Sequence, residues 1–141
     1  MTQTVKMRIV VQKPLPDVQL RLQRGRTELI PPTSRTSKAT TFEFELEVVR
    51  KPDGGFVLRG PEAQGPPSAR FVYINSGTYA GDADSPWGTR AKVALTGLSA
   101  ALLKKALGSP GSVIVGTIAG TAKNGGPAAA TVPLVGDGWE V

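Results

Sequence analysis

Apolar and polar side chains alternate in three segments within the first fifty residues. The clearest is Phe42–Val48, in which three glutamates stand between four apolar residues. Val5–Val11 and Val18–Gln23 show the same period of two, with lysine, arginine or glutamine at the polar positions. This period is typical of a strand with one face on a core and one face in water. Each of the three segments is therefore predicted to be a half-buried β-strand.

Five further strands are predicted, and turn sequences separate several of them. Arg70–Ile74 has four consecutive apolar residues, which is typical of a central strand covered on both faces. Asp53-Gly54-Gly55 and Asn124-Gly125-Gly126 contain the residues that tight hairpins need. Arg24–Thr40 contains Pro31-Pro32 and is predicted to be a loop. The other predicted strands are Phe56–Arg59, Thr89–Leu95, Ser112–Thr121 and Ala128–Val135.

One segment has apolar residues at helical spacing and predicts an α-helix near residues 97–107. Thr96 or Ser99 is placed to cap its start, and Gly108 to end it. So short a helix is marginal alone and has to dock its apolar face on a sheet. The residues at helical spacing are Leu98, Ala101, Leu102 and Ala106.

The length of 141 residues corresponds to a single domain, residues 1–141. The spacing of the turns is that of antiparallel all-β architectures and not of βαβ units. The sequence therefore predicts a mostly β fold: an antiparallel β-barrel or sandwich of about eight strands with one docked helix.

The composition narrows the possible chemistry. The chain has no histidine and no cysteine, which excludes Ser-His-Asp and Cys-His nucleophile pairs, thiolate or imidazole metal sites and disulfides. We predict no catalytic residue, no metal ligand and no cofactor. Ser112–Ala122, the longest weakly polar stretch, is shorter than the roughly 20 residues of a membrane span. Since the amino terminus has no signal-peptide pattern, we expect a soluble cytoplasmic protein without membrane contact.

Charge and glycine patterns have structural explanations. The net charge is +6, from 17 Lys and Arg against 11 Asp and Glu, and favours anionic partners. Three carboxylates on one strand face, those of Glu43, Glu45 and Glu47, would repel one another unless neighbouring strands supplied cations. The glycines of Gly116–Lys123 do not fit a phosphate-binding loop and indicate close strand contact or a bulge. The candidate cations for the glutamate row are Lys6, Arg8 and Arg21.

Candidate binding residues gather between positions 61 and 92, where a long loop follows a strand. Two guanidinium groups match carboxylate or phosphate oxygens, and a phenol and an indole add a hydrogen bond and a flat wall. We predict an anion site bordered by Arg70, Tyr73, Trp87 and Arg90. In the alternative, both arginines pair with Asp82 and Asp84 while Trp87 packs in the core. Strand parity places Arg70 and Tyr73 on opposite faces unless a bulge intervenes.

The same residues carry a resemblance to a known family. The chain resembles a bacterial family of short β-rich proteins of unknown function, over about residues 5–106. The resemblance implies a bacterial, intracellular single domain, and it implies no activity, substrate or cofactor. It rests on Met7-Arg8-Ile9-Val10, Phe42–Val48, Arg59-Gly60-Pro61, Gln64-Gly65-Pro66-Pro67, Arg70–Ile74, Ser85, Trp87 and Arg90-Ala91-Lys92.

Three classes of function remain. The favoured one is a non-catalytic binding or interaction module for an anionic small molecule or an acidic protein partner. The second is a nucleic-acid-binding protein that uses its dispersed basic surface. The least favoured is an enzyme that uses carboxylate or lysine chemistry.

Overall fold

Nine strands and one helix make up the part of the chain that the computed structural model describes, residues 2–12, 18–25, 28–61, 70–78, 88–95, 97–119, 134–136 and 138–141. The helix is α1 (Ala100–Leu107). The strands are β1 (Thr2–Gln12), β2 (Val18–Arg24), β3 (Glu28–Ile30), β4 (Ser34–Arg35), β5 (Ala39–Arg50), β6 (Phe56–Arg59), β7 (Phe71–Thr78), β8 (Gly88–Ala94) and β9 (Val113–Ile118).

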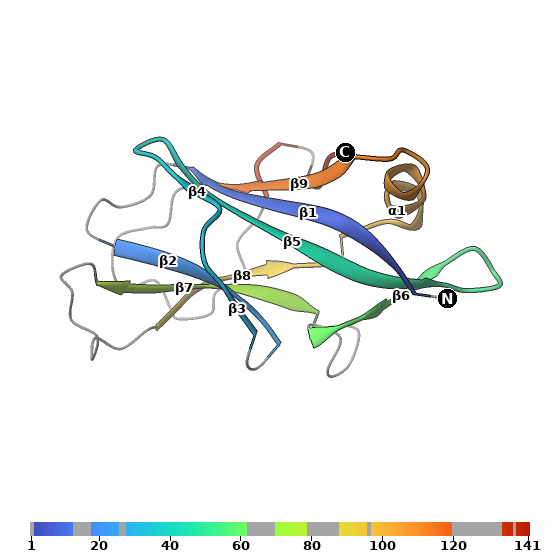
Figure 1. Cartoon of the computed structure of the whole chain (residues 1–141), viewed down its shortest axis with the longest axis horizontal. Coiled ribbons are helices and arrows are strands. Elements are labelled where there is room, and N and C mark those ends of the chain that lie inside the picture. Colours follow the sequence, from blue (N-terminus) through green and yellow to red (C-terminus); the bar gives the residue numbers. More distant parts are fainter. Residues whose placement is uncertain are drawn as a thin grey trace.

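Two sheets face each other across the core (Figure 1). The five-stranded sheet has the order β4-β5-β1-β9, with β6 also paired to β5. The four-stranded sheet has the order β3-β2-β7-β8, so β7 is central as its apolar run predicted. Within the described ranges neither sheet closes into a barrel, and the arrangement is sandwich-like.

The core lies between the two sheets and follows the predicted alternation. Every second residue of β1, from Val5 to Val11, is buried, while the residues between them face outward. β5 alternates in the same way and buries Phe42 to Val48. Each large apolar side chain removed from water contributes about 1.5–3 kcal/mol. The burial confirms all three strands that alternation predicted.

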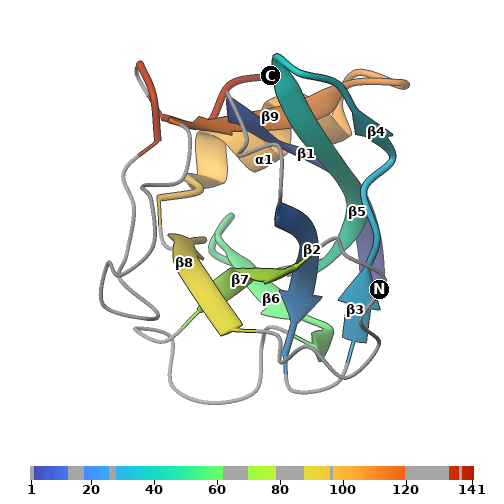
Figure 2. The same ribbon diagram turned by 90° about the vertical axis from the view of Figure 1, so that its left-hand side faces the viewer.

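One strand pair departs from the expected antiparallel pattern. β1 pairs with β9 in parallel, in a register that runs from Lys6 opposite Val113 to Val11 opposite Ile118. The pairs between the other named strands in the described ranges are antiparallel. Along the chain, α1 lies between β8 of the four-stranded sheet and β9 of the five-stranded sheet. In space it lies beside β9 and β1 (Figure 2). The segment that contains α1 connects the two sheets, and after it β9 runs alongside β1 in the same direction.

The predicted loop Arg24–Thr40 was wrong in part, because it contains β3 and β4. Each is an edge strand of only three or two residues, and Pro31-Pro32 separates them. Strands this short have no measurable alternation, so the pattern did not reveal them. The predicted strand Ala128–Val135 lies outside the described residues except for its last two positions, which are not in a named strand.

The predicted helix is confirmed, but its first residue and the set of residues that it buries differ from the prediction. It begins at Ala100 after Ser99, whose Oγ accepts a hydrogen bond from the Leu102 amide at 3.1 Å, and Gly108 follows its end. Leu103 and Ala106 are its buried residues, whereas Leu102 is half-buried. Its eight residues are too few to cross a membrane, and they form the one helix in the described ranges.

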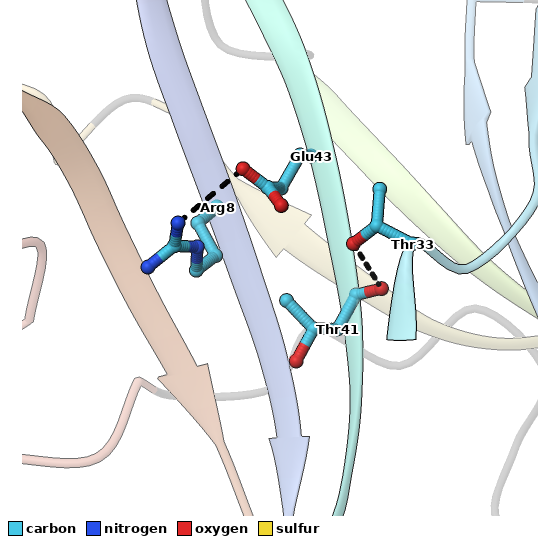
Figure 3. A network of polar contacts seen from close by, with 4 residues as sticks. All are labelled: Arg8, Thr33, Thr41 and Glu43. Atoms are coloured by element: carbon cyan, nitrogen blue, oxygen red, sulfur yellow. Dashed lines mark hydrogen bonds and ion pairs between the residues drawn. The ribbon is translucent and has the colours of Figure 1, made fainter. Parts of the chain in front are cut away.

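The glutamate row lies on the outer face of the five-stranded sheet, as expected. Arg8 Nη2 on β1 is 3.3 Å from Glu43 Oε2 on β5, and Lys6 stands opposite Glu45 (Figure 3). The prediction for Arg21 was wrong, because β2 belongs to the other sheet. Arg59 of β6 stands opposite Glu47 instead. Cross-strand opposite charges therefore offset the repulsion within the row.

The last residues of the chain close the side of the core between β8 and β9. Val115 and Glu140 exchange two backbone hydrogen bonds, of 2.6 and 2.9 Å. They hold Trp139, 8% exposed, so that its Nε1 donates to the Ala94 carbonyl of β8 at 3.4 Å. A Cβ at Gly116 would lie 2.4 Å from Cζ3 of this indole. The close approach at Gly116 is thus to an indole side chain, and not the close strand contact or bulge that the sequence suggested.

Candidate functional site

A pocket of about 410 Å³ is lined by residues of the β5–β6 hairpin, β6 and α1 and by residues just before β7 and after β8. Its volume falls within the range of roughly 300–1,000 Å³ that is usual for small-molecule sites. Of the residues that the structure describes, two cationic and six apolar ones line it. They are Lys51, Arg70, Phe56, Val57, Leu58, Leu95, Leu98 and Leu103.

The hairpin between β5 and β6 positions Lys51. The Lys51 amide donates to the Gly55 carbonyl at 2.7 Å, and the Gly54 amide donates to the Lys51 carbonyl at 3.0 Å. Gly54 has a φ of +89°, which side-chain-bearing residues rarely adopt, and Asp53 Oδ1 accepts from the Gly55 amide at 2.9 Å. The predicted hairpin is thus confirmed. Lys51 Nζ lies 3.8 Å from Asp53 Oδ2, and both side chains are exposed.

The ladder between β7 and β8 positions Arg70. The Leu95 amide donates to the Arg70 carbonyl at 2.9 Å, which extends the pairing one residue beyond each strand. Arg70 therefore has the parity of Val72 and Ile74, which are both 0% exposed and face the core. Its side chain is half-buried, lines the pocket and also takes part in an interaction within the chain. A guanidinium has five N–H donors and can serve a protein partner and a ligand together.

The apolar wall comes from both sheets and the helix. Phe56 and Leu58 of β6 are half-buried, and Leu95 is buried. The Leu98 amide donates to the Leu95 carbonyl at 3.1 Å, so the chain turns directly from β8 into the segment before α1. Leu103 of α1 completes the wall. The pocket is thus a mostly apolar concavity with positive charge from two different segments.

The structure describes only part of the predicted anion site. Tyr73 stands opposite Gln23 of β2 and has the parity opposite to Arg70, so it faces away from the core. Trp87 lies outside the described residues, and so do Asp82 and Asp84. Arg90 is on β8, but its side chain is not among those described. Arg70 lines the same pocket as Lys51, Tyr73 is not among the described lining residues, and the four-residue site stays a prediction.

Sequence reasoning missed Lys51 and the leucines of the wall as pocket residues. Lys51 directly precedes a hairpin turn, and a cation at a strand end beside a turn is the one signal that the sequence offers. The partners across the pocket come from segments 20 to 50 residues away, and no local pattern connects them. Within the described ranges, no three acidic side chains are grouped to hold a metal ion.

Comparison with known proteins places the chain in a family. Searches of curated proteins and of solved structures found no match. A family model matches residues 5–141, so the relationship extends past residue 106, where the resemblance seen in the sequence ended, to the last residue. The chain belongs to the Family of unknown function (DUF5990).

Proposed function

We propose that this protein is a non-catalytic binding module for an anionic small molecule, held in the pocket that Lys51 and Arg70 line. The observation that supports the proposal is the presence of two cationic side chains at a concavity whose other lining residues, among those that the structure describes, are apolar. Electrostatic attraction is stronger beside an apolar wall than in open water, because the effective dielectric is lower there. An anion in this pocket gains charge-assisted hydrogen bonds from the guanidinium.

The placement of other cations supports a local site over a dispersed basic surface. Lys6 and Arg8 stand opposite Glu45 and Glu43 on the outer face of the five-stranded sheet. Arg24 is buried, with Nη1 3.3 Å from Glu28 Oε2 and its guanidinium 4.9 Å from the centre of the Phe44 ring. These cations have carboxylate or aromatic neighbours, as Lys51 has in Asp53, but unlike Lys51 and Arg70 they are not among the described residues of the pocket lining. We therefore rank nucleic-acid binding below binding of a small anion.

The proposal is tested by titrating acetate, benzoate and inorganic phosphate into the protein and following backbone amide shifts. We expect saturable binding of at least one anion, with shifts concentrated in β6, α1 and the Arg70–Leu95 pair. Arg70→Gln should weaken this binding about tenfold or more, since hydrogen bonds to charged groups contribute roughly 1.5–3 kcal/mol. Lys51→Gln should weaken it about two- to tenfold, because its side chain is 47% exposed and screened by solvent.

Arg59→Gln is the matched control, because it removes a positive charge from exposed β6 without touching the pocket lining. It should leave the affinity within about twofold of the original protein. Equal weakening by Arg59→Gln and Arg70→Gln would mean that net charge alone attracts the anion. That result, or no saturable binding of any of the three anions, would contradict the proposal.

A further inference from the structure

We propose that the ligand is an amphipathic acid, with a carboxylate at Lys51 and Arg70 and an alkyl or aryl tail against the apolar wall. This inference rests on the proposed function and adds the chemical class of the ligand. It follows from the described lining of the pocket, which combines two cationic residues with apolar ones.

The charged part of the pocket fits a planar, singly charged headgroup. Arg70 supplies a guanidinium fork, whose two parallel N–H groups match the two oxygens of a carboxylate. Lys51 adds a point charge, and Asp53 Oδ2 lies 3.8 Å from its Nζ. The neighbouring carboxylate offsets part of that charge. A monoanion therefore suits this pair better than a phosphate monoester with nearly two charges.

The apolar part of the pocket requires a tail. A hydrophilic anion bound at Arg70 would leave Phe56, Leu58 and Leu98 facing water, although all three are already half-buried against the core. A tail that covers them gains about fourfold in affinity for each methylene, which is about 0.8 kcal/mol at 1.4 kcal/mol per tenfold. Phe56 also offers a flat ring on which an aryl tail can pack.

The test is a titration with straight-chain carboxylates from acetate to octanoate, each paired with the primary alcohol of the same length, at 150 mM salt. Affinity should rise about fourfold for each added methylene. Octanoate should bind at least tenfold more tightly than 1-octanol, because only the acid engages the cations. Calorimetry measures both series on the full chain.

Two variants separate the headgroup from the tail. Arg70→Gln should reduce the advantage of octanoate over 1-octanol while the increase per methylene remains. Leu98→Ser should flatten that increase while acetate binding stays within about twofold, because this half-buried leucine belongs to the wall and not to the core centre. Lys51→Gln, at an exposed position, repeats the headgroup test without a risk to folding.

Each outcome has one meaning. Acetate and octanoate binding with equal affinity, both weakened by Arg70→Gln, would overturn the amphipathic ligand and leave the small-anion proposal standing. The absence of Arg70-dependent binding for every acid and for phosphate would overturn both. Alcohols that bind as tightly as the acids would also overturn both, because the pocket would then recognise apolar groups alone.

Discussion

At position 116, a side chain as small as a methyl group collides with an indole. Its Cβ would lie 2.4 Å from Cζ3 and 2.7 Å from Cε3 of Trp139, well inside van der Waals contact. The indole cannot withdraw easily, because its Nε1 donates to the Ala94 carbonyl and its neighbour Glu140 is bonded to Val115. Gly116 is therefore required by packing and not by backbone conformation.

Gly116→Ala should lower the free energy of unfolding by about 1–3 kcal/mol, the usual cost of overfilling a packed site. Urea denaturation followed by circular dichroism measures the change. Gly97→Ala is the control, because its Cβ would meet the same indole at an ordinary 3.7 Å. An alanine at 116 that leaves stability unchanged would show that Trp139 does not pack there.

At Thr40, in contrast to Gly116, a substitution is expected to raise the stability of the protein. It is 0% exposed, and its Oγ1 has no hydrogen-bond partner in the described part of the chain. A buried hydroxyl without a partner costs about 1–3 kcal/mol. Thr40→Val keeps the shape and the β-branch, so it should raise the free energy of unfolding by about 1 kcal/mol. Thr4→Val, at an exposed position of β1, should change stability by less than about 0.5 kcal/mol. A loss of stability at position 40 would indicate that the hydroxyl is satisfied.

At the scale of elements, the helix is held by two side chains of its buried face. Leu103→Ala should cost about 2–5 kcal/mol, because Leu103 is 3% exposed and belongs to the core cluster. Lys104→Ala removes the exposed neighbour and should change stability by less than about 0.5 kcal/mol. Thermal unfolding of both variants measures the difference. Similar effects of the two substitutions would place the helix face elsewhere.

A strand can be predicted from the sequence where buried and exposed residues alternate regularly. Short strands and pocket residues that depend on contacts with distant segments cannot be predicted in this way. Alternation in Phe42–Val48 predicted a strand because its two faces see different surroundings. β3 and β4 escaped because a strand of two or three residues takes its structure from the partner that it pairs with. In the candidate site, Arg70 was predicted as one of four anion-site residues, and it lines the pocket. Lys51 was not predicted, because only the hairpin and the packing of α1 bring it to the same pocket.

At the scale of the whole molecule, the last four residues connect the two sheets. Glu140 adds a bridge to β9 of one sheet, and Trp139 donates to Ala94 at the end of β8 of the other. The indole thus fills the space between two strands that are not paired with each other within the described ranges. Residues 138–141 make both contacts without belonging to a named strand or helix themselves.

Removal of residues 138–141 should destabilise the protein by about 3–5 kcal/mol, the range for loss of a buried tryptophan side chain. Hydrogen exchange should then speed up at the amides of β8 and β9 before those of β5. Removal of Val141 alone, which is 40% exposed, is the control and should have little effect. Unchanged exchange in β8 and β9 after the larger deletion would show that the sheets hold together without this segment.

The parallel pairing of β1 with β9 also sets an order of events during synthesis. β1 has β5 on one side once residue 50 is available, but its other side stays open until residue 118 is available. At about 5–20 residues per second, a ribosome needs roughly 3–14 s to add the residues between these two points. Over that interval the edge of β1 that later pairs with β9 has no partner strand, and an unpaired strand edge is a surface that other chains can pair with.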